Sequence, residues 1–262
     1  KIQLELSARR TINQMFDNNN SHRVGATYKI NKGKIFANHA RAFKNPTFTE
    51  RYGYYPGTFN GNENLKPESI KQIEFGYFKS FFENKLNISQ TYYNMKLMNE
   101  INGFTSDGSG GYTALNMTNK SYRKGLETQI EMFINNNSKV TLKHDYVDST
   151  QFDSTAKKQI SEVRRPKNVL NLIYENNFSN HIFLSANILY STKIKDTNFT
   201  SYPYETVFLS DYALANAKIN YNLDNNHTIS FIFNNIFNRK YNEVYGYNNP
   251  GFEFQMNFSR YF

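Results

Sequence analysis

Cysteine and tryptophan are both absent from this chain of 262 residues, and proline occurs only six times. Without cysteine, the chain cannot form a disulfide framework, a zinc finger, an iron–sulfur cluster or a thiol nucleophile. No run of about 18 apolar residues is present, so the sequence offers no candidate for a membrane-spanning helix. The first residues, KIQLELSARR, also lack the apolar core of a secretory signal peptide. These absences exclude disulfide-rich secreted proteins and helical membrane proteins.

Aromatic side chains, by contrast, are abundant. The chain contains 23 Phe and 20 Tyr, and its 31 Lys and Arg exceed its 22 Asp and Glu, giving a formal net charge of +9. Disordered chains are poor in aromatic residues, so we expect a folded protein. The rings must therefore lie in a soluble core or on a lipid-facing surface, where Tyr and Phe also collect.

Hydrophobic residues recur at every second position. In residues 126–134 (LETQIEMFI), Leu126, Ile130 and Met132 share one face, and Glu127 and Glu131 share the other. Residues 182–190 and 251–262 alternate in the same way. Strict alternation predicts extended strands with one apolar and one polar face. Several of these runs reach about ten residues, the length that crosses a bilayer at a tilt, and the polar faces suit a water-filled or plugged lumen.

Turn-forming segments alternate between short and long. Short ones occur at residues 31–34, 82–85, 135–139, 176–180 and 222–227, and longer polar ones at about 43–65, 102–112, 150–163, 196–204 and 238–250. This alternation is typical of an all-β, transmembrane antiparallel up-and-down β-barrel, and counting the segments gives about 12 strands. We predict no linker and no helix. A soluble β-sandwich stays open as an alternative, although long strands with exposed Phe and Met would aggregate in water.

Several segments resemble a known family. Residues 62–68 (NENLKPE), followed by residues 73–76 (IEFG), resemble the N-P-N-L-K-P-E … E-x-G stretch in the barrel of TonB-dependent outer-membrane receptors. Residues 235–262 are similar to the closing segment of that family. Residues 201–207 (SYPYETV) and 241–247 (YNEVYGY) resemble segments of its cobalamin (vitamin B12) receptors, as do DYVD at 145–148 and the Arg164–Arg165 pair.

The resemblance implies a barrel of 22 strands, with an N-terminal plug driven by TonB, in the outer membrane of a Gram-negative bacterium. Residues 1–262 match the C-terminal part of that barrel, so we expect the plug domain and the N-terminal strands to be absent. The TonB complex would then act only through the missing plug. The implied function is active uptake of a large scarce nutrient, and we expect a corrinoid. An iron-siderophore or haem receptor and an independent passive 12-stranded pore stay open as alternatives.

Two residues are candidates for ligand binding because of this resemblance: Arg164, the first of the Arg pair, and Phe199, where the family has Tyr. An Arg fork suits amide oxygens and phosphate, both of which cobalamin carries. The alternative that both are ordinary rim residues stays open. We predict no catalytic residue, metal ligand or cofactor, since the five His are scattered and no nucleophile–base pair is in view.

Basic residues are spread through turns and strand faces. A nucleic-acid-binding surface is expected to gather its basic residues in one patch or stripe, and these residues form no such stripe in the sequence. We therefore expect the partners to be a corrinoid or metal-chelate ligand together with outer-membrane lipid and lipopolysaccharide, and no nucleic acid.

Overall fold

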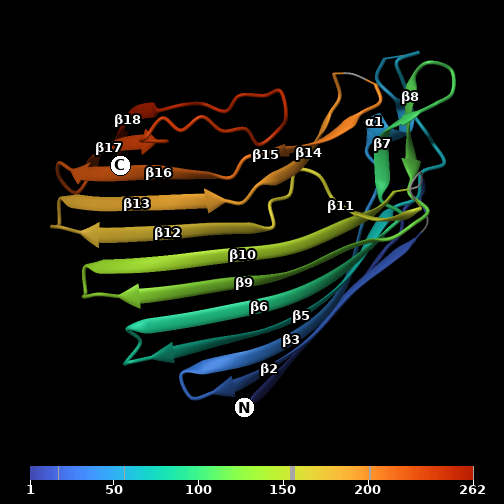
Figure 1. Cartoon of the computed structure of the whole chain (residues 1–262). Helices are drawn as coiled ribbons and strands as arrows, with labels where there is room; N and C mark the ends of the chain where they lie inside the picture. The colour runs from blue at the N-terminus through green and yellow to red at the C-terminus, as the bar shows by residue number, and fades with distance from the viewer. Residues whose placement is uncertain (17, 56, 154–156, 201, 262) are drawn as a thin grey trace.

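In the computed structural model, residues 1–262 are described except for 17, 56, 154–156, 201 and 262. One antiparallel sheet dominates the fold (Figure 1). Its strands follow the order β1 (Ile2–Thr11), β2 (Asn19–Ile30), β3 (Gly33–Lys44), β5 (Glu68–Phe81), β6 (Leu86–Met98), β9 (Ser121–Phe133), β10 (Ser138–Asp153), β12 (Asn168–Asn177), β13 (Ile182–Ser191), β16 (Tyr212–Asn222), β17 (His227–Asn234) and β18 (Glu253–Arg260). The short β11 (Lys158–Ser161) pairs with the end of β10.

The order of the strands confirms the predicted all-β, up-and-down architecture. Each long strand pairs antiparallel with the next long strand along the chain, and twelve strands lie on this path through the described residues. The sheet curves into a trough in which β1 and β18 form the two edges (Figure 1). Strands of 10 to 16 residues, such as β12 and β10, are long enough to cross a bilayer at a tilt.

The two ends of the sheet differ as the turn pattern predicted. Tight turns join the strands at one end, and long loops with their own secondary structure gather at the other (Figure 1). The loops carry α1 (Phe48–Tyr52), the three-stranded sheet β4 (Phe59–Asn60), β7 (Ile101–Ser106) and β8 (Tyr112–Asn116), and the hairpin β14 (Ile194–Asn198) with β15 (Glu205–Leu209). No helix in the described residues is long and apolar enough to cross a membrane.

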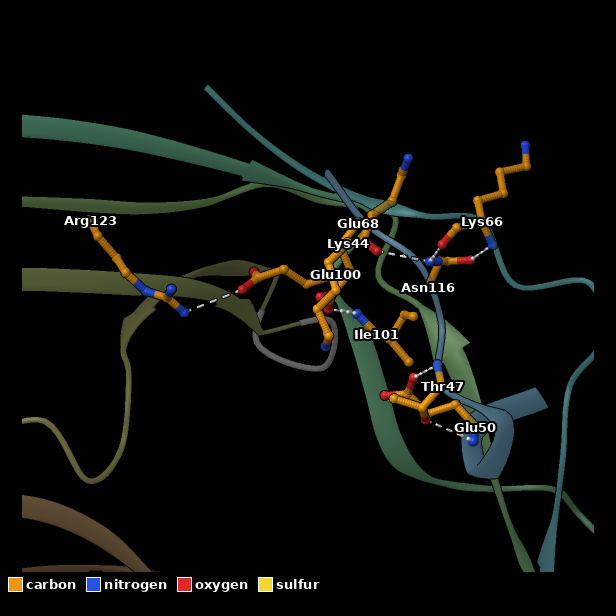
Figure 2. Close-up of polar contacts among 10 residues, drawn as sticks. Lys44, Thr47, Glu50, Lys66, Glu68, Glu100, Ile101, Asn116 and Arg123 are labelled. Carbon is orange, nitrogen blue, oxygen red and sulfur yellow. Dashed lines mark hydrogen bonds and ion pairs between the residues drawn. The ribbon is translucent and has the colours of Figure 1, made fainter. Parts of the chain in front are cut away.

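The prediction that no helix would form was wrong for α1. Thr47 and Glu50 form a capping box, in which the Glu50 backbone N–H donates to Thr47 Oγ1 (3.2 Å) and the Thr47 N–H donates to Glu50 Oε2 (2.7 Å; Figure 2). The T-x-x-E spacing that makes this reciprocal cap is present in the sequence. The helix is short because Gly53 follows with a positive φ and ends it.

The two faces of the sheet have opposite character. Ile130 in β9 lies opposite Leu142 in β10, which in turn lies opposite Leu172 in β12, whereas the neighbouring row joins Glu131 to Thr141. Residues directly opposite one another project to the same side, so these rows form one apolar and one polar face. The apolar face stays exposed: Leu172, for example, is 46% exposed.

In the described part of the chain, no sealed core covers that apolar face. Buried hydrophobic side chains among the described residues form two small clusters, Phe59 with Leu65 and Ala114, and Ile194 with Leu209 and Tyr212. The first cluster lies in the long loops, and the second joins the β14–β15 hairpin to the adjacent start of β16. The large apolar side chains of the Leu142–Leu172 face, such as Ile130 and Ile188, therefore face outward, as a lipid-contacting barrel wall requires.

Gly125 in β9 has no side chain, and the Tyr93 ring and the Tyr146 carbonyl oxygen occupy the position that a Cβ atom would take. We predict that adding even a methyl group at this residue destabilises the sheet. A Cβ atom would come within 2.5 Å of the Tyr93 ring and nearer still to the Tyr146 carbonyl oxygen, which is backbone and cannot rotate away. We expect Gly125→Ala to lower the free energy of unfolding by about 1–3 kcal/mol, the usual cost of overpacking. A urea unfolding midpoint would measure it.

The matched control is Gly103→Ala in β7, where nothing lies within 4 Å of the added Cβ. We expect that variant to unfold like the parent protein. Equal midpoints for the two variants would contradict the steric argument.

Candidate functional site

The ends of the long strands at the loop side are tied together by ion pairs. Arg123 in β9 donates from Nε to both carboxylate oxygens of Glu162 (3.1 Å each), and its Nη2 lies 3.3 Å from Glu100 Oε1 (Figure 2). Glu162 is only 7% exposed and also lies 2.5 Å from Arg165 Nε. This alternation of two cations and two carboxylates fixes the segments that follow β6 and β11 against the wall.

The β7–β8 hairpin is held by a second set of contacts. Glu68, the first residue of β5, accepts from the Ile101 N–H (2.7 Å) and from Lys44 Nζ (3.1 Å; Figure 2). Asn116 at the end of β8 bonds both main-chain groups of Lys66, accepting from its N–H at 2.7 Å and donating to its carbonyl at 2.8 Å. These contacts anchor the loop sheet on the ends of β3 and β5.

A buried aspartate joins three separate loops. Asp196 has no exposed side-chain surface and accepts from Arg164 Nε (2.9 Å), the Thr197 N–H (2.8 Å) and the Tyr245 N–H (2.7 Å). We call Arg164, Asp196 and Tyr245 the loop clamp. Burial alone would raise the pKa of Asp196, but the N–H groups of Tyr245 and Thr197 and the Arg164 guanidinium together hold it below its ordinary value.

The predicted ligand-binding residue Arg164 therefore has a structural contact as well. Its backbone is in the left-handed region (φ 58°), and its N–H donates to the Lys195 carbonyl at 2.7 Å. The side chain remains 44% exposed, although Nε is engaged with Asp196. Since a guanidinium carries five N–H donors, Arg164 has further donors besides the Nε–H that binds Asp196.

Phe199, the other predicted ligand-binding residue, lies on the same hairpin as Asp196. Its side chain is 60% exposed and packs edge-on against Tyr204, with ring centroids 5.1 Å apart, while Tyr202 packs against Tyr204 at 5.7 Å. We call these three residues the aromatic tip. Ser201, which begins the SYPYETV segment, lies outside the described residues. The structure thus places Arg164 against the base of the hairpin and Phe199 at its tip.

The sequence did not reveal Asp196, Glu162 or Arg123 as parts of this layer. Asp196 lies 32 residues from Arg164 and 49 from Tyr245, so no local spacing links them. The only signal is the position of Asp196 at the boundary of a predicted loop. Within the described residues, no group of three or more His, Asp and Glu side chains is arranged to hold a metal ion.

Long antiparallel strands, an apolar outer face, a polar inner face and elaborated loops at one end define a transmembrane β-barrel wall of the outer-membrane type. The family model described as "TonB dependent receptor-like, beta-barrel" matches residues 1–236. The chain therefore belongs to the TonB-dependent receptor β-barrel family, whose members are outer-membrane proteins.

Individual relatives are distant and longer than this chain. The vitamin B12 transporter BtuB of Vibrio cholerae is 24% identical over 245 residues, which cover 93% of this chain and 37% of BtuB. The siderophore receptor PirA of Acinetobacter baumannii superposes with a TM-score of 0.79 at 17% identity, covering 99% of this chain and 43% of PirA. The pyoverdine receptor FpvA of Pseudomonas aeruginosa, bound to pyoverdine, gives 0.70 at 17% identity, covering 93% and 36%. At these identities the solved structures show the shared fold.

Proposed function

We propose that this chain forms the wall and the outer ligand-facing loops of a receptor that takes up a corrinoid. The observation that carries the proposal is the exposed aromatic tip on a hairpin whose base is fixed by the loop clamp. A binding surface needs rings that are accessible yet held in place, because ordering a mobile loop costs part of the binding free energy. The loop clamp supplies that order before the ligand arrives.

The chemistry of the two candidate residues suits such a ligand. The rings of Phe199 and its neighbours can pack against the flat face of a macrocycle. The exposed part of the Arg164 guanidinium can donate to amide oxygens and phosphate. The similarity to a vitamin B12 transporter over 93% of the chain supports a corrinoid in particular. Energy for transport would reach the barrel through a plug domain and the TonB complex.

An iron-siderophore receptor is the second candidate. The similar solved structures include receptors for siderophores, and an aromatic tip beside a cation also suits an anionic metal chelate. A passive 12-stranded pore is less well supported, because β1 and β18 lie at opposite edges of the sheet and are not paired in the described residues. Titrating the protein, purified from outer membranes, with cyanocobalamin, a ferric catecholate chelate and haem would separate the candidates. Tight binding of the chelate or haem alone would overturn the corrinoid proposal.

We expect Phe199→Ala to weaken cyanocobalamin binding roughly tenfold, the usual cost of truncating an aromatic contact residue at an interface. Isothermal titration calorimetry would measure the dissociation constant. Phe82→Ala is the matched control, because Phe82 is equally aromatic and 75% exposed but lies in a tight turn at the other end of the sheet. Equal losses in the two variants would show that Phe199 does not contact the ligand.

A further inference from the structure

Three cations lie side by side across neighbouring strands. Arg41 in β3 is directly opposite Lys71 in β5, and Lys71 is directly opposite Lys96 in β6. Directly opposed residues of antiparallel strands project to the same face, and neighbouring strands are only about 4.8 Å apart. These three side chains therefore form one short line across the sheet, which we call the rim cation row.

The rim cation row lies on the lipid-facing side, near its upper edge. Lys71 shares its face with Ile73 and Phe75, which follow at alternate positions of β5 and are 58% and 55% exposed. Each cation of the row is two or three residues from the loop-side end of its strand, since β3 ends at Lys44, β5 begins at Glu68 and β6 ends at Met98. On this face Ile73 lies between His39 and Asn94 just below the row, and the next row down, Ala37, Phe75 and Tyr92, begins the apolar surface.

The charges of the row are not compensated within the described part of the chain. No carboxylate there forms an ion pair with Arg41, Lys71 or Lys96, and the nearby acids pair elsewhere, Glu68 with Lys44 at 3.1 Å and Asp148 with Lys124 at 3.4 Å. Like charges directly opposite each other destabilise a sheet. An external anion at this height would relieve that repulsion.

We propose that the rim cation row binds the phosphate groups of lipopolysaccharide in the outer leaflet. The ligand must combine anionic groups at the level of the row with acyl chains at the level of Ile73 and Phe75, and a phosphorylated lipid has this arrangement. Arg and Lys are the side chains that bind phosphate best, Arg through its fork and Lys as a point charge. The proposal rests on the outer-membrane location of the family and is independent of the transported nutrient.

The test compares a triple substitution of the row with a matched control. The row variant carries Arg41→Gln, Lys71→Gln and Lys96→Gln. The control carries Lys29→Gln, Lys32→Gln and Lys34→Gln, which remove the same charge from exposed positions at the tight-turn end of β2 and β3. Each protein, purified from outer membranes in mild detergent, is titrated with bisphosphorylated lipid A by native mass spectrometry. We expect the row variant to bind roughly 100-fold more weakly than the parent, from a factor of about five per lost cation, and the control to bind like the parent.

Further arms identify the ligand chemistry and guard against misfolding. A charge-conserving variant should retain binding; it carries Arg41→Lys, Lys71→Arg and Lys96→Arg. In a second arm, dephosphorylated lipid A should bind the parent protein as weakly as intact lipid A binds the row variant. Unchanged binding in the row variant, or equal binding of dephosphorylated lipid A, would overturn the proposal. Displacement of lipid A by inorganic phosphate would show that the row takes a free anion and would overturn the lipid assignment.

Discussion

Replacing Asp196 with alanine should release the closing loop, residues 235–252, from the β14–β15 hairpin. The substitution removes the acceptor of the Thr197 and Tyr245 N–H groups and the partner of Arg164. Arg164 is partly exposed and can return to water, so the main cost is two orphaned main-chain donors. We expect the local free energy of opening to fall by about 2–4 kcal/mol, since a buried unsatisfied donor costs about 1–3 kcal/mol. Hydrogen exchange at the Tyr245 amide would measure it.

The pH dependence of the same contact provides a second measurement. Because the pKa of Asp196 is lowered in the folded protein, its stabilising effect is complete above the unfolded value of about 4 and is lost as pH falls through the folded value. Protection of the Tyr245 amide should therefore be constant near neutral pH and weaken only below about pH 4. The Asp196→Ala variant should lack this acid transition.

Asp211→Ala is the matched control for Asp196. Asp211 lies just beyond β15, is exposed, and accepts one hydrogen bond from the Tyr190 hydroxyl at 3.2 Å. We expect this variant to stay within about 0.5 kcal/mol of the parent, as is usual at exposed positions. If Tyr245 exchanges at the parental rate in Asp196→Ala, the loops are held together by other contacts and the loop clamp has no such role.

The sequence predicted the wall of this fold much better than its loops. The alternation in residues 126–134 has a physical cause. Successive residues of β9 face lipid and lumen in turn, so apolar and polar residues alternate with a period of two. The turn residues that join the strands act locally too, which explains why the short turns were placed correctly. The α1 capping box at Thr47 and Glu50 is equally local, because both of its hydrogen bonds join residues only three positions apart.

The outer loops were harder to predict because their structure depends on contacts between distant segments. Nothing near Asp196 in the sequence indicates Arg164 or Tyr245 as its partners, and nothing near Glu162 indicates Arg123. Arg164 was singled out by resemblance alone, as a ligand contact. The structure adds that it also pairs with a buried carboxylate, so its substitution would alter both the loops and any ligand contact. Phe199 is therefore the better probe of binding.

Placing an arginine at Leu172 should disrupt the assembled protein, whereas the same change at the next residue, Ile173, should be tolerated. Leu172 is central in β12 and shares the lipid-facing row with Leu142 and Ile188. Ile173 is just as apolar but shares the opposite row with Thr141 and Asn187. In a soluble protein with a sealed core, the arginine substitution would be more destabilising at the more buried of the two residues. In a barrel surrounded by lipid, the substitution should be more destabilising at the more exposed residue, Leu172.

The expected difference is large because a charge in the middle of the bilayer loses its hydration. Leu172→Arg should destabilise the folded protein by about 2–4 kcal/mol, as arginine does on the lipid face of outer-membrane barrels near the midplane, while Ile173→Arg should change it by less than about 1 kcal/mol. Unfolding by guanidinium chloride in lipid vesicles would give both values, and the heat-dependent mobility of the barrel on gels would report the folded fraction. Because the two positions are adjacent in one strand, propensity and expression are closely matched. Equal destabilisation by both substitutions, or a larger effect at Ile173, would mean that the apolar face of this sheet does not meet lipid.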